Sequence, residues 1–219
     1  MSRVTSPIDH DVLCRCYASH TYLICTANPA LTHYNPIDGG AKMVDITEKA
    51  MRNLDRVSQD TTGDSLIRWA MAEGKVTITE SIRKALFTNT AEANWNTPKG
   101  NVMQVARLAG IQAAKQTSHL IPLCHQIPLT MVQINFRLEG TTVRIQSVVK
   151  AVGKATGVEM EALTAVAVAA LTTYDMLKSV EPSGIVISQI ELLEKHGGKS
   201  GSFVKQANHG VLQLMKQNV

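Results

Sequence analysis

The sequence has no apolar run approaching the roughly 20 residues that a helix needs to cross a bilayer. Its longest apolar stretches are the alanine-rich segment 162–171 and the short run 185–187. It also has no block of lysine or arginine of the kind that follows a nucleic-acid backbone, and its formal net charge is only +4. We therefore expect a soluble protein that binds neither membranes nor nucleic acid. The small basic excess favours a small anionic ligand.

Cysteine is scarce, and most of it lies in the N-terminal segment. This distribution does not fit the disulfide framework of a secreted domain, so it favours a reducing compartment. The spacing fits none of the paired zinc patterns, so we predict no metal site, and metal binding by this segment stays an open alternative. The residues concerned are His10, Cys14, Cys16, His20 and Cys25.

The same N-terminal segment bears on localisation. Its arginines and hydroxyl residues suggest a mitochondrial transit peptide, whereas Asp9 and Asp11 argue against one. We expect a cytoplasmic protein, with the mitochondrial matrix as the alternative. Turn-forming residues at 34–40 mark the start of the folded part. The expected organisation is a flexible extension over 1–40, one catalytic domain over 41–203 and a tail over 204–219.

Hydrophobic periodicity predicts an α+β domain. Alternating apolar and polar residues indicate strands, whereas apolar residues at helical spacing indicate helices. The segment 48–63 is polar with weak periodicity, and 59–64 is predicted to be an exposed loop. The expected elements are a strand at 75–79, a short helix at 79–86, a helix at 100–120, strands at 130–138 and 143–151, a helix at 158–180 and a strand at 185–193.

This order of strand, helix, strand, strand, helix, strand is that of the ferredoxin-like split βαβ fold. We therefore expect an antiparallel sheet with its helices on one face. Strand 143–152 carries Val148 and Val152 on the side opposite Ile145, so both faces of the sheet need cover. Oligomerisation is a natural way to cover the second face.

Charged residues stand out in the long helix predicted at 158–180. Glu161 and Asp175 lie about 21 Å apart along a helix, so they cannot act on the same bond. Asp175 and Lys178 are helix neighbours, and each influences the ionisation of the other. The alternative interpretation is an ordinary surface ion pair, which contributes little to stability.

Other candidate residues lie in loops. His125, in the link after Pro122, is a candidate for proton transfer or for a hydrogen bond to phosphate. The glycine-rich segment 195–201 resembles a phosphate-binding loop, although Leu193 excludes a Walker A motif. Lys99 precedes a helix whose dipole opposes its charge, which favours a bound anion there. A flexible basic loop remains the alternative for 195–201.

Several longer motifs together resemble one known family. The pair TGVEMEALT and LIPLCH is highly specific, and the resemblance covers residues 41–203. On these motifs the chain is similar to the cyclic pyranopterin monophosphate synthase family, also called MoaC, which acts in molybdenum cofactor biosynthesis. The segments are Met-Val-Asp at 43–45, KGNVMQVARLAGIQAAKQTSHLIPLCH at 99–125, TGVEMEALTAVAVAALTTYDM at 156–176 and LLEKHGGKSG at 192–201.

The resemblance implies a ferredoxin-like fold in a homohexamer of three dimers, with sites at the dimer interface. It implies conversion of 3′,8-cyclo-7,8-dihydroguanosine 5′-triphosphate to cyclic pyranopterin monophosphate and pyrophosphate. No obligatory cofactor is implied, although Mg²⁺ can accompany the triphosphate. By matching motifs, the catalytic positions are Asp175, Lys178 and Lys99. The substrate-binding positions are Leu123, Cys124, His125, Glu159, Met160, Glu161, Lys195, Lys199 and Arg68.

The chain departs from the family pattern at several places. It has an insertion around 50–64, a longer loop around 89–97 and an extra residue near Ala155. Gln126 replaces a usual proline and Leu177 a usual cysteine. None of these changes removes a residue with an implied catalytic role.

Two other functions remain as alternatives. The first is a noncatalytic nucleotide-binding module that keeps the fold and the lysines, although Asp175, Lys178 and Lys99 argue against it. The second is a domain that binds RNA on its sheet. That function needs exposed aromatic residues, and the two central strands contain only Phe136.

Overall fold

The computed structural model describes residues 33, 35, 39–55, 66–86, 95–153, 156–197 and 201–205, and for 54–55 the backbone alone. The predictions for Cys14, Cys16 and Cys25 and for most of 1–40 lie outside these residues. The elements are α1 (Thr47–Asp55), β1 (Ile67–Thr77), α2 (Glu80–Leu86), β2 (Asn96–Thr97), β3 (Gly100–Asn101), α3 (Val102–Lys115), α4 (Thr117–Leu120), β4 (Leu129–Glu139), β5 (Thr142–Val152), α5 (Glu159–Leu177), β6 (Val186–His196) and β7 (Phe203–Val204).

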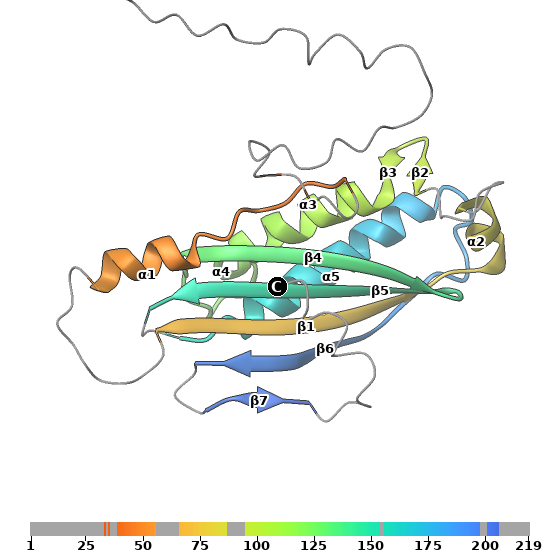
Figure 1. Ribbon diagram of the computed structural model, residues 1–219. Helices are drawn as coiled ribbons and strands as arrows, with labels where there is room; N and C mark the ends of the chain where they lie inside the picture. Colours follow the sequence, from red (N-terminus) through yellow and green to blue (C-terminus); the bar gives the residue numbers. More distant parts are fainter. Residues whose placement is uncertain are drawn as a thin grey trace, which may run out of the picture. The chain divides into compact units, whose positions relative to one another are not determined.

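The larger sheet is antiparallel throughout, with strand order β4-β5-β1-β6-β7 (Figure 1). β4 and β5 form the predicted hairpin. β1 lies between β5 and β6 in the sheet, although several elements separate it from both strands in the sequence. Without β7, this is the strand order of the ferredoxin-like fold. The prediction of an α+β ferredoxin-like domain is confirmed.

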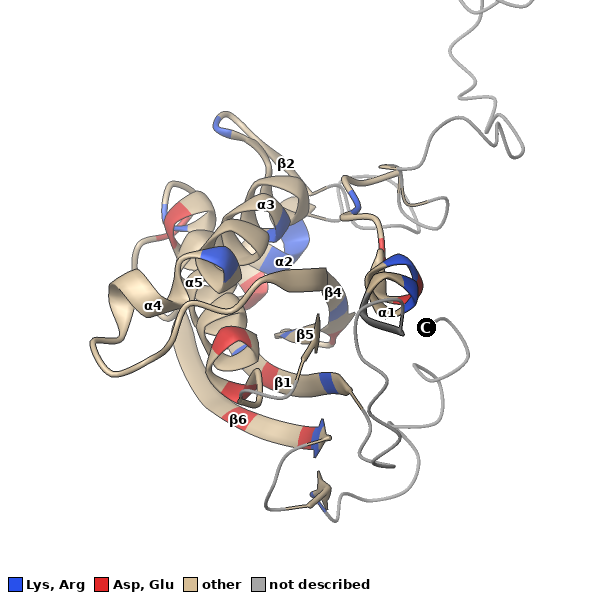
Figure 2. Ribbon diagram, turned by 90° about the vertical axis from the view of Figure 1, so that its left-hand side faces the viewer, with Lys and Arg blue, Asp and Glu red and all other residues tan. Residues whose placement is uncertain are grey.

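The main core lies between one face of the sheet and the helices α3 and α5, which Figure 2 shows side by side on that face. β4 contributes Val132 and Ile134, and α5 contributes Ala165 and Ala169, all almost fully buried. The predicted alternation over 130–138 is therefore confirmed, because Val132 and Ile134 point to the core and Arg137 does not.

α3 and α5 approach closely at a glycine. A Cβ added to Gly110 of α3 would lie 2.9 Å from the carbonyl oxygen of Ala165 and 3.2 Å from the Cβ of Ala169, both on α5. No such contact can be relieved by rotating a side chain, because the nearest atom belongs to the backbone. A glycine at this position therefore sets the distance between the two helices.

The second face of the sheet, away from α3 and α5, also buries apolar residues. Met71, Met131, Val148 and Leu193 form a small cluster, against which Trp69 packs. The expectation that Val148 is buried opposite the main core is confirmed. Trp69, Met71 and Val148 line a hollow of about 710 Å³, together with Thr47 at the start of α1.

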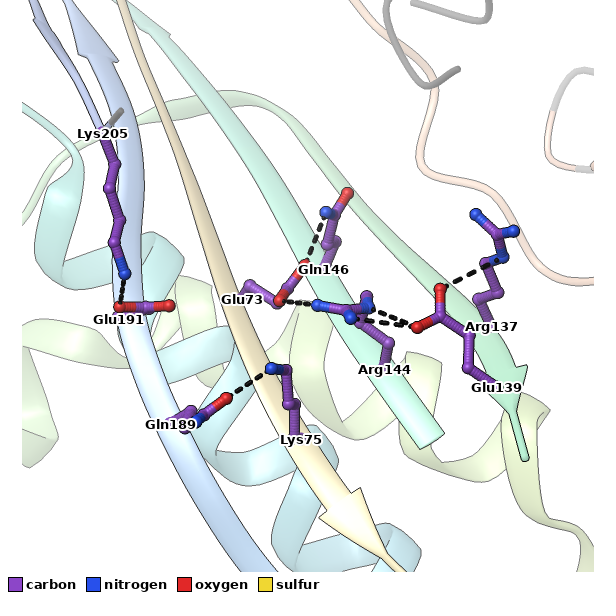
Figure 3. Close-up of polar contacts among 9 residues, drawn as sticks. All are labelled: Glu73, Lys75, Arg137, Glu139, Arg144, Gln146, Gln189, Glu191 and Lys205. Atoms are coloured by element: carbon purple, nitrogen blue, oxygen red, sulfur yellow. Dashed lines mark hydrogen bonds and ion pairs between the residues drawn. The ribbon is translucent and has the colours of Figure 1, made fainter. Parts of the chain in front are cut away.

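Further along the second face, charged side chains replace the apolar ones (Figure 3). Arg144 of β5 is ion-paired with Glu73 of β1, and it also bonds Glu139 of β4 at 2.9 Å. Glu73 is buried and accepts a second hydrogen bond from Gln146 at 2.8 Å. The hydrogen bonds from Arg144 hold the pKa of Glu139 below its usual value. The network joins three strands on a face that no described helix covers at this point.

The structure differs from the sequence-based expectation in two places. β1 begins at Ile67, well before the predicted strand at 75–79, and residues 47–55 form α1, where no element was predicted. The loop predicted at 59–64 lies outside the described residues. α1 starts at a polar anchor: Asp45 accepts a hydrogen bond from the Thr47 backbone N–H at 2.8 Å and pairs with Lys150 at 3.0 Å. Burial raises the pKa of Asp45, but these bonds outweigh it and hold that pKa below its usual value.

The contact at Gly110 gives the first testable prediction. In an unconstrained helix, Gly→Ala is stabilising by up to about 1 kcal/mol. Here Gly110→Ala is expected to lower the free energy of unfolding by about 1–3 kcal/mol, because the added methyl group must push α3 away from α5. Urea unfolding of the variant measures this difference. Gln112→Ala, at an exposed position of the same helix, is the control. A Gly110→Ala protein as stable as the wild type would contradict the close contact.

Candidate active site

Lys99, Asp175 and Lys178 form one group, here called the lysine–aspartate cluster. Asp175 lies in the last turn of α5, Lys178 is the residue that ends this helix, and Lys99 lies in the turn between β2 and β3. The Lys178 Nζ is 2.7 Å from Oδ1 of Asp175, and the Lys99 Nζ is 3.1 Å from Oδ2. Lys99 also donates to the backbone oxygen of Asp175 at 2.9 Å. The carboxylate is thus held between two ammonium groups from different elements.

The electrostatics of this cluster follow from these contacts. The hydrogen bond from Lys178, followed by that from Lys99, holds the pKa of Asp175 below its usual value. The same bond to Asp175 raises the pKa of Lys178. Two ammonium groups and one carboxylate leave one net positive charge, and the side chains are 40–54% exposed. The cluster therefore offers a solvent-accessible cationic surface in which a carboxylate is already ionised.

A second group of predicted residues surrounds the start of α5 and is here called the N-terminal group. It consists of Arg68, His125, Glu159, Glu161 and Lys195. Glu159 Oε1 pairs with the Lys195 Nζ at 3.0 Å, which ties α5 to the end of β6.

The absence of a side chain at Gly157 leaves room for the side chain of Glu159. A Cβ at Gly157 would lie 2.0 Å from Oε2 of Glu159, so the carboxylate folds back over a position that only glycine leaves open. Any larger residue there would displace the side chain of Glu159, and with it the ion pair to Lys195.

Glu161 is the buried member of the N-terminal group, with 3% of its surface exposed. Burial raises the pKa of its carboxyl group, and the charge of Glu159 raises it further, although a backbone hydrogen bond acts in the opposite direction. Met160, between the two glutamates, is exposed. A carboxyl group with a raised pKa keeps its proton to a higher pH than an ordinary glutamate, and such shifted groups often occur at functional sites.

Arg68 and His125 line the same hollow, of about 380 Å³. Arg68 is buried, and its Nε has no hydrogen-bond partner among the described residues. Gly197, in the glycine-rich loop, has φ of 81°. A Cβ there would be 2.2 Å from the Ile67 carbonyl oxygen and 3.2 Å from Nη1 of Arg68, so this glycine lies against the guanidinium group. An unsatisfied guanidinium N–H beside such a loop fits an anionic ligand group.

The structure places the remaining predicted residues as follows. Leu123 is 93% exposed, and Cys124 carries a free, half-buried thiol in the link before β4. Lys199 lies outside the described residues. No group of three or more His, Cys, Asp or Glu side chains suitable for a metal ion occurs in the described part of the chain.

The two groups are far apart within one chain. Glu159 and Asp175 both belong to α5, which runs unbroken between them, so they are separated by about 24 Å at a rise of about 1.5 Å per residue. This geometry agrees with the expectation that Glu161 and Asp175 of one chain cannot act on the same bond of a substrate. α5 is long and apolar enough to cross a membrane, but more than half of it is buried, as in a core helix.

The fold and these groups define an α+β domain with cationic and carboxylate side chains at both ends of one core helix. The chain belongs to the MoaC family, whose model matches residues 43–198. It is 44% identical to the cyclic pyranopterin monophosphate synthase of Staphylococcus aureus (strain Newman) over 182 residues, which is 81% of this chain and 97% of that protein.

Two further relatives carry the same name. The chain is 47% identical to the protein of Heliobacterium modesticaldum over 179 residues, which is 80% of this chain and 98% of the relative. It is 45% identical to the protein of Desulfitobacterium hafniense over 178 residues, which is 80% of this chain and 94% of the relative. The resemblance drawn from the motifs is confirmed.

The raised pKa of Glu161 gives a prediction of pH dependence. Because the folded-state pKa lies above the unfolded value, the folded protein binds the proton more tightly, and stability falls as pH rises through the folded pKa. Glu161→Gln removes this titration. The variant should therefore be more stable than the wild type at pH 8, and the difference should vanish below about pH 4.3, the usual glutamate pKa.

Thermal midpoints of both proteins between pH 4 and pH 8 measure this effect. The control is Glu48→Gln, at an exposed position of α1 far from Glu161 in the sequence, where no pH-dependent difference of this kind is expected. A Glu161→Gln protein that is less stable than the wild type at pH 8 would show that the carboxylate is satisfied in its ionised form.

Proposed function

We propose that this protein converts 3′,8-cyclo-7,8-dihydroguanosine 5′-triphosphate to cyclic pyranopterin monophosphate and pyrophosphate in molybdenum cofactor biosynthesis. It would be a lyase that forms a cyclic phosphate. The proposal is supported by relatives named cyclic pyranopterin monophosphate synthase that match nearly along their full length. The observation that carries it is the lysine–aspartate cluster, because the ion pair of Asp175 with two lysines occurs in residues of the family motifs.

The chemistry requires the properties of this cluster. Rebuilding a guanine-derived ring as a pterin involves several proton transfers, for which an ionised Asp175 and two protonated lysines can serve as base and acids. Release of pyrophosphate places negative charge on phosphate oxygens, which ammonium groups stabilise without forming a covalent intermediate.

The N-terminal group is proposed to bind the substrate. Arg68, Lys195 and Lys199 would contact the triphosphate, and the buried N–H of Arg68 supports this. Glu159, Met160 and Glu161 would contact the ring system, together with Leu123, Cys124 and His125. No obligatory cofactor is proposed, and Mg²⁺ can accompany the triphosphate.

A single chain cannot close this site, because its two groups lie at opposite ends of α5. If the α5 helices of two copies pack antiparallel, the cluster of one copy meets the partner subunit's Glu159. Exposed apolar side chains on α3 and α5 support such a contact, because monomers rarely expose many of them together. They are Val105, Leu108, Met160 and Leu171.

The proposed assembly is a homohexamer of three such dimers, in which the site lies at the dimer interface. The proposed catalytic domain spans 41–203, between the extension over 1–40 and the tail over 204–219. The expected compartment is the cytoplasm, with the mitochondrial matrix as the alternative.

The first test of this function concerns the cluster itself. Lys99→Ala, Asp175→Asn and Lys178→Ala should each lower turnover about 100-fold or more, since general acid–base groups typically contribute this much. Product is measured by mass spectrometry with substrate supplied by the upstream radical enzyme. Thermal midpoint and oligomeric state are measured alongside.

A matched control is available on α2. Glu80 and Arg83 form an ion pair of the same i,i+3 spacing and 2.8 Å length, also solvent-exposed. Glu80→Gln and Arg83→Ala should leave turnover unchanged. Wild-type turnover in all three cluster variants would reject the proposed site, whereas an inactive wild type would reject the proposed function.

The second test asks whether two chains share one site. A Lys99→Ala chain and a Glu159→Gln/Lys195→Ala chain should each be inactive, but their heterodimer contains one intact site. Co-refolding equal amounts should therefore restore about a quarter of wild-type turnover, because half of the randomly paired dimers are mixed.

Mixing Lys99→Ala with Asp175→Asn is the control, since both substitutions lie in the same group and every site stays defective. Equal recovery in the two mixtures, or none in either, would show that the two groups do not meet across subunits.

A further inference from the structure

The position of Lys99 depends on a very small hairpin. β2 and β3 contain two residues each, with Asn96 paired to Asn101 and Thr97 paired to Gly100. Lys99 lies in the two-residue turn between them, and its side chain is 40% exposed. No surrounding core restrains this lysine. Its reach to Asp175 must therefore be set by the backbone of the turn and by the bonds of its own ammonium group.

The hydroxyl group of Thr97 organises this turn from inside. Its Oγ1 accepts a hydrogen bond from the Lys99 backbone N–H at 3.2 Å and donates one to the Gly100 carbonyl oxygen at 3.1 Å. The other turn residues suit the same geometry. Pro98 has the fixed φ favoured at the second position of a turn, and Gly100 adopts a φ of 110° that other residues rarely adopt. One side chain thus contacts the backbone of Lys99 and that of the residue after it.

The base of the hairpin is fixed to the helix layer. Asn101 donates from Nδ2 to Asn96 Oδ1 at 3.2 Å, and its own Oδ1 accepts from the Gln104 backbone N–H at 3.0 Å. Asn101 therefore caps α3. The Val102 N–H also bonds the carbonyl oxygen of the buried Trp95 at 2.8 Å.

Because α3 packs against α5, the helix that carries Asp175, the base of the hairpin and the carboxylate belong to one packed unit. The base is thereby fixed relative to Asp175. The remaining freedom lies in the turn, where the Thr97 hydroxyl makes its two bonds.

We propose that Thr97 is a positioning residue of this site, whose hydroxyl holds the turn that keeps the Lys99 ammonium group on Asp175. The inference rests on the proposed catalytic function of Lys99, but the contact itself can be tested without turnover. The two hydrogen bonds of the Thr97 hydroxyl go to the backbone of Lys99 and Gly100, so its proposed effect on Asp175 passes through the turn and Lys99. If Lys99 moves freely, fewer molecules hold its ammonium group in the reactive geometry. Displacements of about 1 Å can lower rates by about 100-fold.

The kinetic experiment compares Thr97→Val with Thr97→Ser. Valine keeps the branched shape and removes both hydrogen bonds, whereas serine keeps the hydroxyl group. Thr97→Val should lower kcat about tenfold with little change in KM, and Thr97→Ser should restore most of it. In a Lys99→Ala background, Thr97→Val should have no further effect, since the two residues act as one unit.

The structural experiment needs no activity. Brief labelling with an amine-reactive reagent, followed by peptide mass spectrometry, reports how freely each lysine reacts. Lys99 should label several-fold faster in Thr97→Val than in the wild type or in Thr97→Ser. Lys178, whose backbone belongs to α5, should change little and is the internal control. Thermal midpoints check that each variant is folded, and Thr97→Ala replaces Thr97→Val if the latter is not.

The outcomes separate the two proposals. Wild-type kcat and wild-type Lys99 labelling in Thr97→Val would overturn the role of Thr97. A Thr97→Val effect of equal size in the Lys99→Ala background would also overturn it, because Thr97 would then act by another route. If the wild type forms no product, the proposed function fails, and the labelling result still decides whether Thr97 positions Lys99.

Discussion

α5 can lie against both α3 and β1 only because glycines remove side chains at the two contacts. Gly110 admits the backbone of α5 at Ala165, and Gly74 of β1 admits Val166, whose Cγ1 would lie 2.5 Å from a Cβ at that position. α5 is thus one continuous helix that packs against α3 on one side and β1 on the other. Its length then fixes the distance between Glu159 and Asp175. The division of the candidate site into two groups thus follows from the unbroken course of α5 between them, and the contacts at Gly110 and Gly74 hold this helix against α3 and β1.

The two ends of α5 offer different electrostatic environments. At the C-terminal end, Asp175 is exposed and ion-paired with two ammonium groups, which lower the pKa of its carboxyl group and keep it ionised. At the N-terminal end, Glu161 is buried, and its carboxyl group binds a proton more readily than usual. A site assembled from one end of each of two helices would combine an ionised carboxylate with a carboxyl group that holds its proton more readily than usual. Neither end alone provides both.

Most of the fold follows from the sequence because its pattern is regular where one face is buried. The strands at 130–138 and 143–151 were predicted well, since polar residues alternate with apolar ones there. The first half of β1 was missed because Trp69, Ala70, Met71 and Ala72 are apolar without alternation, as both faces of the sheet are partly covered. α1 was missed because polar bonds fix its start.

The candidate site was predictable only in part, for a related reason. The pair of Asp175 and Lys178 follows from helical spacing, and the structure confirms that contact. The contact between Lys99 and Asp175 spans 76 positions in the sequence, so no local pattern indicates it. The roles of Gly157 and Gly197 depend on close approaches to Glu159 and Ile67, which only the folded chain displays. The motifs identified these positions through the family, without giving the physical reason.

The bond between Asn96 and Asn101 also bears on the length of the segment before Lys99. The sequence predicts a longer loop around 89–97 than the family pattern has, and an insertion so close to Lys99 would ordinarily shift this lysine. Here the last two residues of that segment form β2, and the hairpin closes at Asn96 and is anchored to α3 by Asn101. The register of Lys99 is therefore set from the side of α3, whatever the length of the segment that precedes Trp95.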